Sequence, residues 1–297
     1  MDISIQNLTK IYGNGHKALK EVNIEIENGM FGLLGANGAG KSTLMRILVS
    51  LMQPTSGKVL VNGMELNKHR KEIRSMTGYL PQDFSSFPKL KTWEFLDYTA
   101  RLGGLKDKRK RRDAIDEMLE EVGLFEARER FANNLSGGMK RRLGIAQALI
   151  GEPKIIIVDE PTTGLDPDER IRFRNLLTKI STRDVIIILS THIVGDISST
   201  CTQMALLRSG NLVYSGSPEM LMREAKGKVW RIHATHEQFD EVNVNFNVIS
   251  TIPSVGGWDL EVVAESANGY LAEPIEPNLE HAYVYYMEHM SETSLTH

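Results

Sequence analysis

A glycine-rich stretch at residues 35–43 constrains the fold more than any other feature; its sequence is Gly-Ala-Asn-Gly-Ala-Gly-Lys-Ser-Thr. It follows an apolar run at 30–34 and precedes a helix-like segment at 44–51. Plain turns share this composition, but strand, loop and helix in this order are the context in which G-x-x-x-x-G-K-[ST] cradles phosphate. Lys41 is predicted to reach the outer phosphates, and Ser42 to ligate the accompanying Mg²⁺.

The apolar pattern of the rest of the chain predicts an α/β fold. Residues 155–158 and 185–189 are continuously apolar, and a helical segment at about 167–180 lies between them. Strands that are apolar on both faces and alternate with helices indicate a parallel sheet buried between helical layers. Residues 3–8 and 22–26 alternate between apolar and polar, which indicates half-buried antiparallel strands. Shorter strands are expected at 58–61 and 77–80, and helices from 92 to about 122 and from 135 onward.

A basic run at 106–112 has two interpretations. Its sequence is Lys-Asp-Lys-Arg-Lys-Arg-Arg, and such clusters bind nucleic acids or lipid headgroups in some proteins. No aromatic residue interleaves the charges to stack on bases. A solvated helix start is therefore the favoured interpretation.

Charge divides the chain near residue 227. Residues 228–297 contain 2 basic and 11 acidic residues, although the whole chain carries only −3. This change predicts one domain at 1–225 and a small accessory α+β domain at 226–297. We expect strands at 229–234, 242–249 and 258–263 in the second domain, and a closing helix at 279–287. Its histidines, at positions 233, 236, 281, 289 and 297, lack ligand spacing and are expected on the surface.

The chain is predicted to be soluble without a membrane span of its own. The single cysteine, Cys201, excludes an internal disulfide and suits a reducing compartment. The N-terminus lacks the pattern of a signal peptide. The apolar runs at 155–158 and 185–189 are far shorter than the ~20 residues that cross a bilayer. Any membrane function then needs a separate spanning polypeptide.

Two carboxylates follow the apolar strand at 155–158. Behind a phosphate loop, Asp159 is placed to hold the Mg²⁺ shell. Glu160 is placed to polarise a water for in-line attack on the terminal phosphate. A turn that ends in a helix cap is the structural alternative for this Asp-Glu-Pro sequence.

Taken in order along the chain, these motifs resemble those of ABC-type ATPases. The resemblance rests on residues 35–43, Gln82, the Leu-Ser-Gly-Gly sequence at 135–138, the 155–160 strand end, Gly-Leu-Asp at 164–166 and His192. It covers residues 2 to about 222. It implies a P-loop ABC ATPase fold with a parallel-sheet core, an antiparallel β subdomain and an inserted helical subdomain at about 84–150.

The resemblance also implies roles for individual residues. Tyr12 matches the aromatic that stacks on adenine, although a lone tyrosine also suits a core. Gln82 matches the glutamine at the metal site, and His192 the histidine that contacts the γ-phosphate. Asp166 matches the loop at the subunit interface. The resemblance implies that Mg²⁺ is held by Ser42, Gln82 and Asp159. It implies that Glu160, His192 and Gln82 take part in catalysis. The implied nucleotide-binding residues are Tyr12, Gly35, Asn37, Gly38, Gly40, Lys41, Ser42, Thr43, Ser136, Gly137, Gly138 and Asp166.

The signature at 136–138 makes the site depend on a second chain. A serine N-cap and two glycines expose a helix N-terminus to an anion, and in the family this element serves the nucleotide of the opposite subunit. Met139 stands where the family commonly has glutamine, which weakens any role for that side chain. Residues 78–84, 135–142 and 277–282 look like bacterial drug, antibiotic or antimicrobial-peptide exporter ATPases. The implied complex is an ATP-binding dimer, held to the cytoplasmic face of the membrane by a separate permease.

Other functions fit the sequence less well. A soluble ABC ATPase that acts on nucleic acid or the ribosome usually carries two cassettes or a long coiled coil, and neither is present; no nucleic-acid partner is expected. A nucleotide-regulated binding protein with little turnover would be expected to lose Glu160. A GTPase is disfavoured because the sequence at 67–70, Asn-Lys-His-Arg, lacks the aspartate that reads guanine.

Overall fold

The computed structural model describes the backbone of residues 1–293 and the side chains of residues 1–288. The chain divides into two compact units, one formed by residues 1–196 and 200–215, the other by residues 197–199 and 216–297. Within residues 1–293, no helix is both long and apolar enough to span a bilayer.

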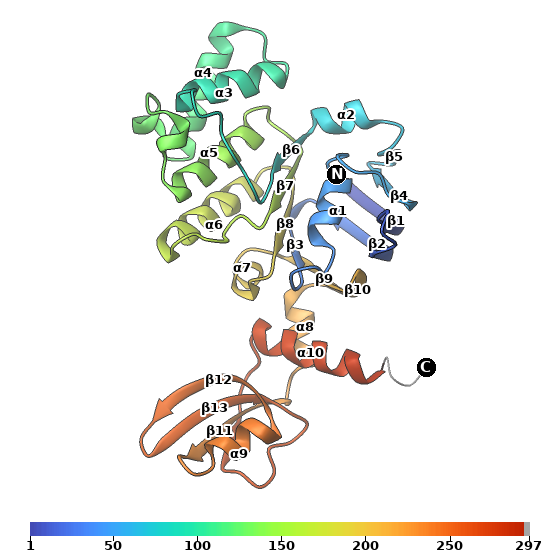
Figure 1. Ribbon diagram of the computed structural model, residues 1–297, viewed down its shortest axis with the longest axis vertical. Coiled ribbons are helices and arrows are strands. Elements are labelled where there is room, and N and C mark those ends of the chain that lie inside the picture. The colour runs from blue at the N-terminus through green and yellow to red at the C-terminus, as the bar shows by residue number, and fades with distance from the viewer. Residues whose placement is uncertain (294–297) are drawn as a thin grey trace. The chain divides into compact units, whose positions relative to one another are not determined.

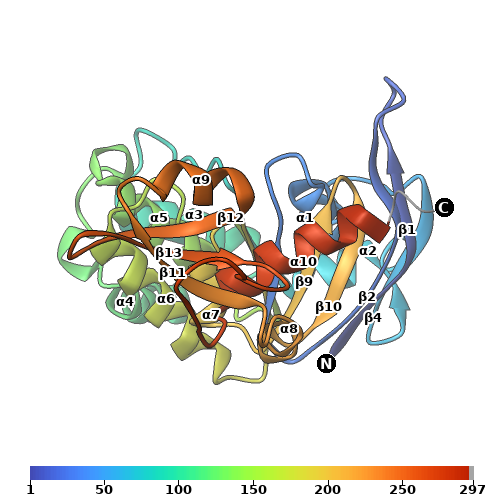
Figure 2. The same cartoon turned by 90° about the horizontal axis from the view of Figure 1, so that it is seen from below.

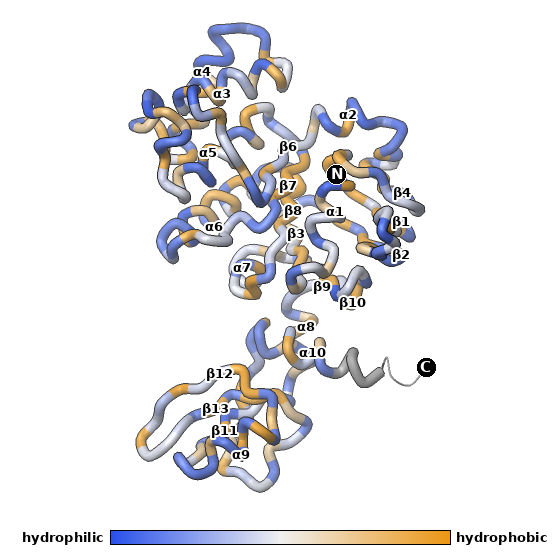
Figure 3. Tube along the Cα trace, viewed as in Figure 1, coloured by the Kyte–Doolittle hydropathy of each residue, from blue (hydrophilic) through white to orange (hydrophobic). Residues whose placement is uncertain are grey.

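The first unit is built around a six-stranded sheet in the order β10-β9-β3-β8-β7-β6. Its parallel pairs join β3 to β8 and β9, β8 to β7, and β7 to β6. The strands are β3 (Gly29–Leu34), β6 (Thr77–Leu80), β7 (Ile155–Asp159), β8 (Ile186–Thr191), β9 (Gln203–Arg208) and β10 (Asn211–Gly216). The buried parallel core confirms the α/β prediction, and β7 and β8 form an apolar band in Figure 3.

A second sheet of the first unit is antiparallel. Its order is β2-β1-β4-β5, and β1 and β2 form a long ribbon (Figure 2). The bounds are β1 (Asp2–Ile11), β2 (Lys17–Glu27), β4 (Ser56–Val61) and β5 (Met64–Glu65). Helix α1 (Lys41–Leu48) lies between the two sheets (Figure 1), where Leu44, Met45 and Ile47 share one core with both.

The opposite face of the six-stranded sheet is covered by α5 (Gly137–Leu149) and α6 (Pro167–Ser181) (Figure 1). The remaining helices of this unit include α2 (Arg70–Ser75), α3 (Thr92–Leu102) and α4 (Lys108–Glu121), with short 3-10 turns at Phe125–Ala127 and Ala132–Asn134. Helix α7 (Val194–Ser198) follows β8. Glycines permit close contact between α5 and β6: a methyl group on Gly78 would lie 2.0 Å from the Ala148 carbonyl oxygen.

The basic run at 106–112 opens α4, as expected for a helix start. Asp107 caps the helix by accepting from the backbone N–H groups of Arg109 and Lys110. Arg111 is buried, and its Nε donates to Asp97 Oδ1 at 2.5 Å. Part of this run therefore stabilises the fold rather than presenting charge to a partner.

The second unit contains a four-stranded antiparallel sheet in the order β12-β13-β11-β14. Its elements are α8 (Pro218–Glu224), β11 (Val229–Thr235), α9 (Phe239–Asn245), β12 (Asn247–Ser254), β13 (Gly257–Val263), β14 (Ala272–Pro274) and α10 (Leu279–Thr293). Helix α9 covers the sheet face that carries Ile232 and Leu260, and Val242 joins that core.

Two expectations for the second unit were wrong. The strand predicted at 242–249 is instead α9 followed by β12. The alternation Val-Asn-Val-Asn-Phe-Asn imitates a strand, but Val242 is buried and Val244 is 84% exposed, so packing of one valine decides the local structure. His281 is buried rather than on the surface, and its Nε2 lies 3.1 Å from Glu261 Oε2. His233 and His236 are at least partly exposed; the side chains of residues 289 and 297 lie outside the described ones.

The α5–β6 contact makes a prediction about stability. Gly78→Ala should lower the free energy of unfolding by about 1–3 kcal/mol, because the added methyl forces the strand off the helix. Urea unfolding followed by circular dichroism measures the change. Gly151→Ala is the matched control, since its methyl would meet no described atom within 4 Å. Equal stability of the two variants would contradict the packing.

Candidate nucleotide-binding site

The carboxyl ends of four adjacent parallel strands converge on one cavity of about 510 Å³. The loop after β3 leads to Lys41, and Gln82, Glu160 and His192 follow β6, β7 and β8. Ligands of open parallel sheets bind at this edge. The lining residues are Tyr12, His16, Ala18, Asn37, Gly38, Gly40, Lys41, Ser42, Thr43, Gln82, Glu160, Thr163 and His192.

The glycine-rich loop has a backbone that requires glycine. Gly40, the N-cap of α1, has a φ of +109°. A methyl group there would also lie 2.5 Å from the Ala18 carbonyl oxygen. The loop therefore delivers α1 with its N-terminus at the cavity, where backbone N–H groups and the helix dipole favour an anion.

Lys41 and Glu160 form a buried ion pair at the wall of the cavity. Lys41 Nζ lies 3.2 Å from Glu160 Oε1, and the two side chains are 4% and 6% exposed. The same ammonium donates to the carbonyl oxygens of Gly35 and Ala36. Glu160 Oε2 lies 3.1 Å from His192 Nδ1. A polyphosphate at the loop would compete with Glu160 for this ammonium.

A second buried carboxylate lies beside Ser42. The Ser42 hydroxyl donates to Asp159 Oδ1 at 3.4 Å, and Asp159 is 2% exposed. Ser190 Oγ also donates to Asp159 Oδ1, at 2.5 Å. Hydroxyl and carboxylate oxygens are ligands that suit Mg²⁺, which usually takes its remaining ligands from water and phosphate. Among the described residues no group of three or more His, Cys, Asp or Glu could hold a metal.

Tyr12 also lines the cavity. Its hydroxyl lies 3.0 Å from Thr43 Oγ1. Its ring stacks on His16, with centroids 6.3 Å apart. Tyr12 is only half-buried, so part of its ring remains accessible from the cavity.

The structure describes Ser136, Gly137, Gly138 and Asp166 fully, and none of them lines this cavity. Ser136 caps α5 by accepting from the backbone N–H of Met139 at 3.3 Å. Asp166 caps α6 by accepting from the backbone N–H of Glu169 at 2.8 Å. Most residues predicted to contact nucleotide therefore lie either at the cavity or at helix starts outside it. Gly35 does neither, since it stands behind the cavity wall as an acceptor for Lys41 Nζ.

Four residues at the cavity or its carboxylates, namely Ala18, His16, Thr163 and Ser190, were not predicted from the sequence. His16 stacks on Tyr12, and Thr163 Oγ1 donates to Glu160 Oε2 at 3.3 Å. Ser190 lies beneath Asp159 and also accepts from the Glu160 backbone N–H. Thr163 is close to Glu160 in sequence and could have been suspected, but nothing local marks His16 or Ser190.

Fold and site together define a P-loop nucleotide-binding protein with an antiparallel sheet beside the parallel core. The model of the ABC transporter family matches residues 19–163. The ABC transporter ATP-binding protein YxlF of Bacillus subtilis (strain 168) is 37% identical over 235 residues, which cover 77% of this chain and 76% of that protein. The bacitracin transport ATP-binding protein BcrA of Bacillus licheniformis is 37% identical over 213 residues, covering 71% and 68%.

Solved structures agree with these relatives. The dimeric bacterial ABC transporter cassette MJ0796 superposes with a TM-score of 0.67 at 28% identity, over 72% of this chain and 98% of that one. A post-hydrolysis dimer of MJ0796, bound to ADP and Pi, gives a TM-score of 0.66. The chain therefore belongs to the ABC transporter family, as an ATP-binding subunit with ATPase activity.

Proposed function

We propose that this chain hydrolyses ATP as one half of a dimer that drives a separate membrane permease, and that the transporter is an exporter. The observation that carries the proposal is the buried Glu160 carboxylate, held between Lys41 and His192 over the phosphate loop. The resemblance of residues 78–84 and 135–142 to exporter ATPases favours export, and BcrA is a bacitracin transport protein. The methionine import protein MetN of Vibrio vulnificus (strain YJ016) is also 36% identical, over 72% of this chain and 65% of that protein, so direction needs its own test.

In this proposal the phosphates of ATP lie against the loop and the start of α1. Lys41 binds the outer phosphates, and the loop residues around Gly38 donate backbone N–H groups. Ser42, Asp159 and Gln82 would hold Mg²⁺, since their oxygens suit it and Ser42 already contacts Asp159. Bound Mg²⁺ neutralises charge on the phosphate oxygens. Tyr12 stacks on the adenine ring.

Glu160 acts as the general base. It accepts a proton from a water whose oxygen attacks the γ-phosphorus, and the bond from that phosphorus to the bridging oxygen breaks, giving ADP and phosphate. His192 contacts the γ-phosphate and steadies Glu160, whose Oε2 is 3.1 Å from its Nδ1. Lys41 would then pair with Glu160 before ATP binds and with the phosphates when ATP is bound.

The helix starts outside the cavity serve the second copy. Ser136, Gly137 and Gly138 present the N-terminus of α5, which suits the γ-phosphate bound by the partner. Asp166 lies at the corresponding interface loop. Two chains would thus enclose two ATP molecules, and the dimeric MJ0796 cassette supports this arrangement.

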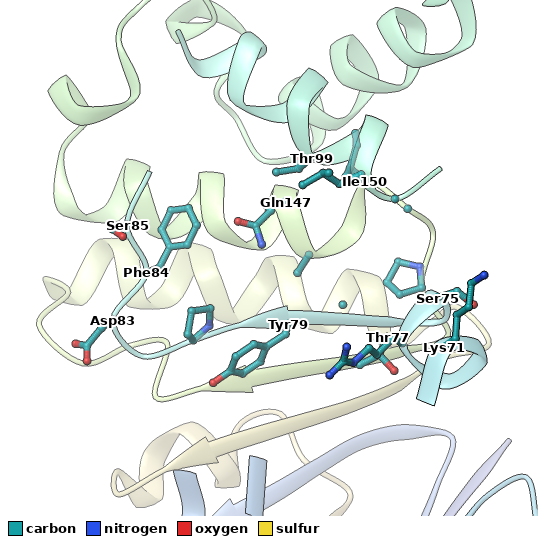
Figure 4. Close-up of a pocket in the computed structure, with 18 residues that line it drawn as sticks. Lys71, Ser75, Thr77, Tyr79, Asp83, Phe84, Ser85, Thr99, Gln147 and Ile150 are labelled. Carbon is teal, nitrogen blue, oxygen red and sulfur yellow. The ribbon is translucent and has the colours of Figure 1, made fainter. Parts of the chain in front are cut away.

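The permease would dock at a cavity of about 660 Å³ on the first unit (Figure 4). Tyr79 of β6 lies on one side, and Thr99 and Gln147 of two helices lie on the other. The segment from Gln82 to Phe84 runs from the nucleotide cavity to this one. Movement at the γ-phosphate would therefore reach the permease through one short loop, at the cytoplasmic face of the membrane.

The acidic C-terminal region completes the proposal as an accessory domain. The sequence placed this boundary at 225/226, but α8 (Pro218–Glu224) belongs to the second compact unit. We therefore assign residues 1–196 and 200–215 to the ATPase domain, with a helical subdomain at about 84–150, and the residues from 216 onward to the accessory domain. Its sheet, α9 and their shared core support independent packing. Regulation of the dimer or contact with the permease are the roles it would serve.

Replacement of the base gives the sharpest test of hydrolysis. Glu160→Gln should lower kcat by about 10²–10⁴-fold, retain ATP binding and accumulate an ATP-bound dimer. Steady-state phosphate release and size-exclusion chromatography with ATP measure both effects. Glu152→Gln is the matched control, because Glu152 is an exposed glutamate that also has a positive φ. A Glu160→Gln variant with the wild-type rate would remove Glu160 as the base.

If the permease docks at this surface, the chain should capture a membrane protein through it. Phe87 is 50% exposed and packs on Phe95 and Tyr98. Phe95 in turn packs on Phe84, which lines the docking cavity. Phe87→Ser should lower recovery of a polytopic protein from detergent-solubilised membranes of the native host by about 10-fold, as expected for an interface aromatic. Phe131→Ser, at a site of 47% exposure, should not. Recovery of no polytopic protein by the wild type would contradict the permease proposal.

A further inference from the structure

One buried guanidinium joins the two loops that flank the nucleotide cavity. Arg141 belongs to α5 and is 9% exposed. Its Nη1 donates to the carbonyl oxygens of Pro81 at 3.1 Å and Gln82 at 2.6 Å. Its Nη2 donates to the Glu160 carbonyl oxygen at 2.7 Å, and its Nε to that of Pro161 at 2.9 Å. Only arginine offers enough donors in a fixed plane for four such acceptors.

These contacts fall on a backbone that is not relaxed. Glu160 has a φ of +45°, in the left-handed region that non-glycine residues enter at a cost of about 1–2 kcal/mol. Such a conformation persists only where the surroundings determine it. The Glu160 N–H is bonded to both Oγ and O of Ser190 on β8, and Arg141 holds the carbonyl end. The peptide that carries the carboxylate is therefore fixed on both sides.

The charge of Arg141 also suits this position. Burial lowers the pKa of the guanidinium, and the negative charges of Asp159, Asp83 and Glu160 oppose that shift. Because the ordinary value for arginine lies far above neutral pH, the group stays protonated and keeps all its donors. Without it, four main-chain carbonyls next to the site would lose their partner.

We propose that Arg141 is a positioning residue for ATP hydrolysis. It holds Glu160 in the left-handed conformation that aims the carboxylate into the cavity, and it keeps the Gln82 loop in register with that carboxylate. Arg141 itself does not line the cavity among the described residues. The inference rests on the proposed role of Glu160 as the base.

The kinetic test compares Arg141→Ala with Arg112→Ala in the purified full-length chain. Arg112 is an exposed arginine of α4 and serves as the matched control. Arg141→Ala should lower kcat about 10- to 100-fold, because small misplacement of a catalytic group costs this much. The KM for ATP should change by less than roughly threefold, since the phosphate loop is untouched. Arg112→Ala should leave both unchanged.

Two further measurements separate positioning from general damage. Guanidinium ion at non-denaturing concentration should raise the kcat of Arg141→Ala and leave that of Arg112→Ala unchanged. In a Glu160→Gln background, Arg141→Ala should add less than about twofold to the loss in single-turnover hydrolysis, because the group it positions is gone. If Arg141→Ala fails to fold, Arg141→Lys replaces it, and lower kcat with unchanged KM and melting temperature is expected.

Each outcome is decisive. If Arg141→Ala or Arg141→Lys folds and keeps the wild-type kcat while Glu160→Gln is inactive, the proposed role of Arg141 is wrong and that of Glu160 stands. Losses that multiply in the double variant, or a KM that rises with the fall in kcat, also overturn it. Wild-type activity of Glu160→Gln instead overturns the proposed base, and the Arg141 inference falls with it.

Discussion

The strand order β3-β8-β7-β6 is the constraint on which the site depends. Because these strands are parallel neighbours, their carboxyl ends share one edge of the sheet. Lys41, His192, Glu160 and Gln82 come from four distant parts of the sequence and meet there. A different order of the same strands would separate the phosphate loop from the carboxylates. The fold therefore fixes the chemistry before any ligand is considered.

Burial then sets what the assembled groups can do. A buried ion pair such as Lys41–Glu160 gains little stability, because desolvation of both charges offsets their attraction. We propose that the pair serves function instead, as a cation and a carboxylate that exchange partners when phosphate binds. Arg141 adds a different kind of order, since it bonds main-chain oxygens and so determines where the Glu160 and Gln82 loops lie.

Short sequence motifs predicted much of this arrangement. The long-range contacts that position Glu160 could not be predicted from them. The phosphate loop, the strand ending at Asp159 and the cap at Ser136 are signalled by short runs of sequence, and the structure shows a strand or helix boundary at each. Ser190 and Arg141 bond to the Glu160 main chain from 30 and 19 residues away in the sequence. Such partners can be identified only from the tertiary structure. The error at 242–249 has the same origin, because alternation that looks like a strand was overridden by packing of Val242.

We propose that each cavity is half of a site, which the α5 N-terminus of a second copy completes. Disulfide trapping tests it directly, in a background where Cys201→Ser removes the single cysteine. One chain carries Asn37→Cys at the cavity, and another carries Met139→Cys beside the signature. Mixing them under oxidising conditions should give a covalent mixed dimer with ATP and little without it. A yield that does not depend on ATP, or no mixed dimer at all, would contradict the shared site.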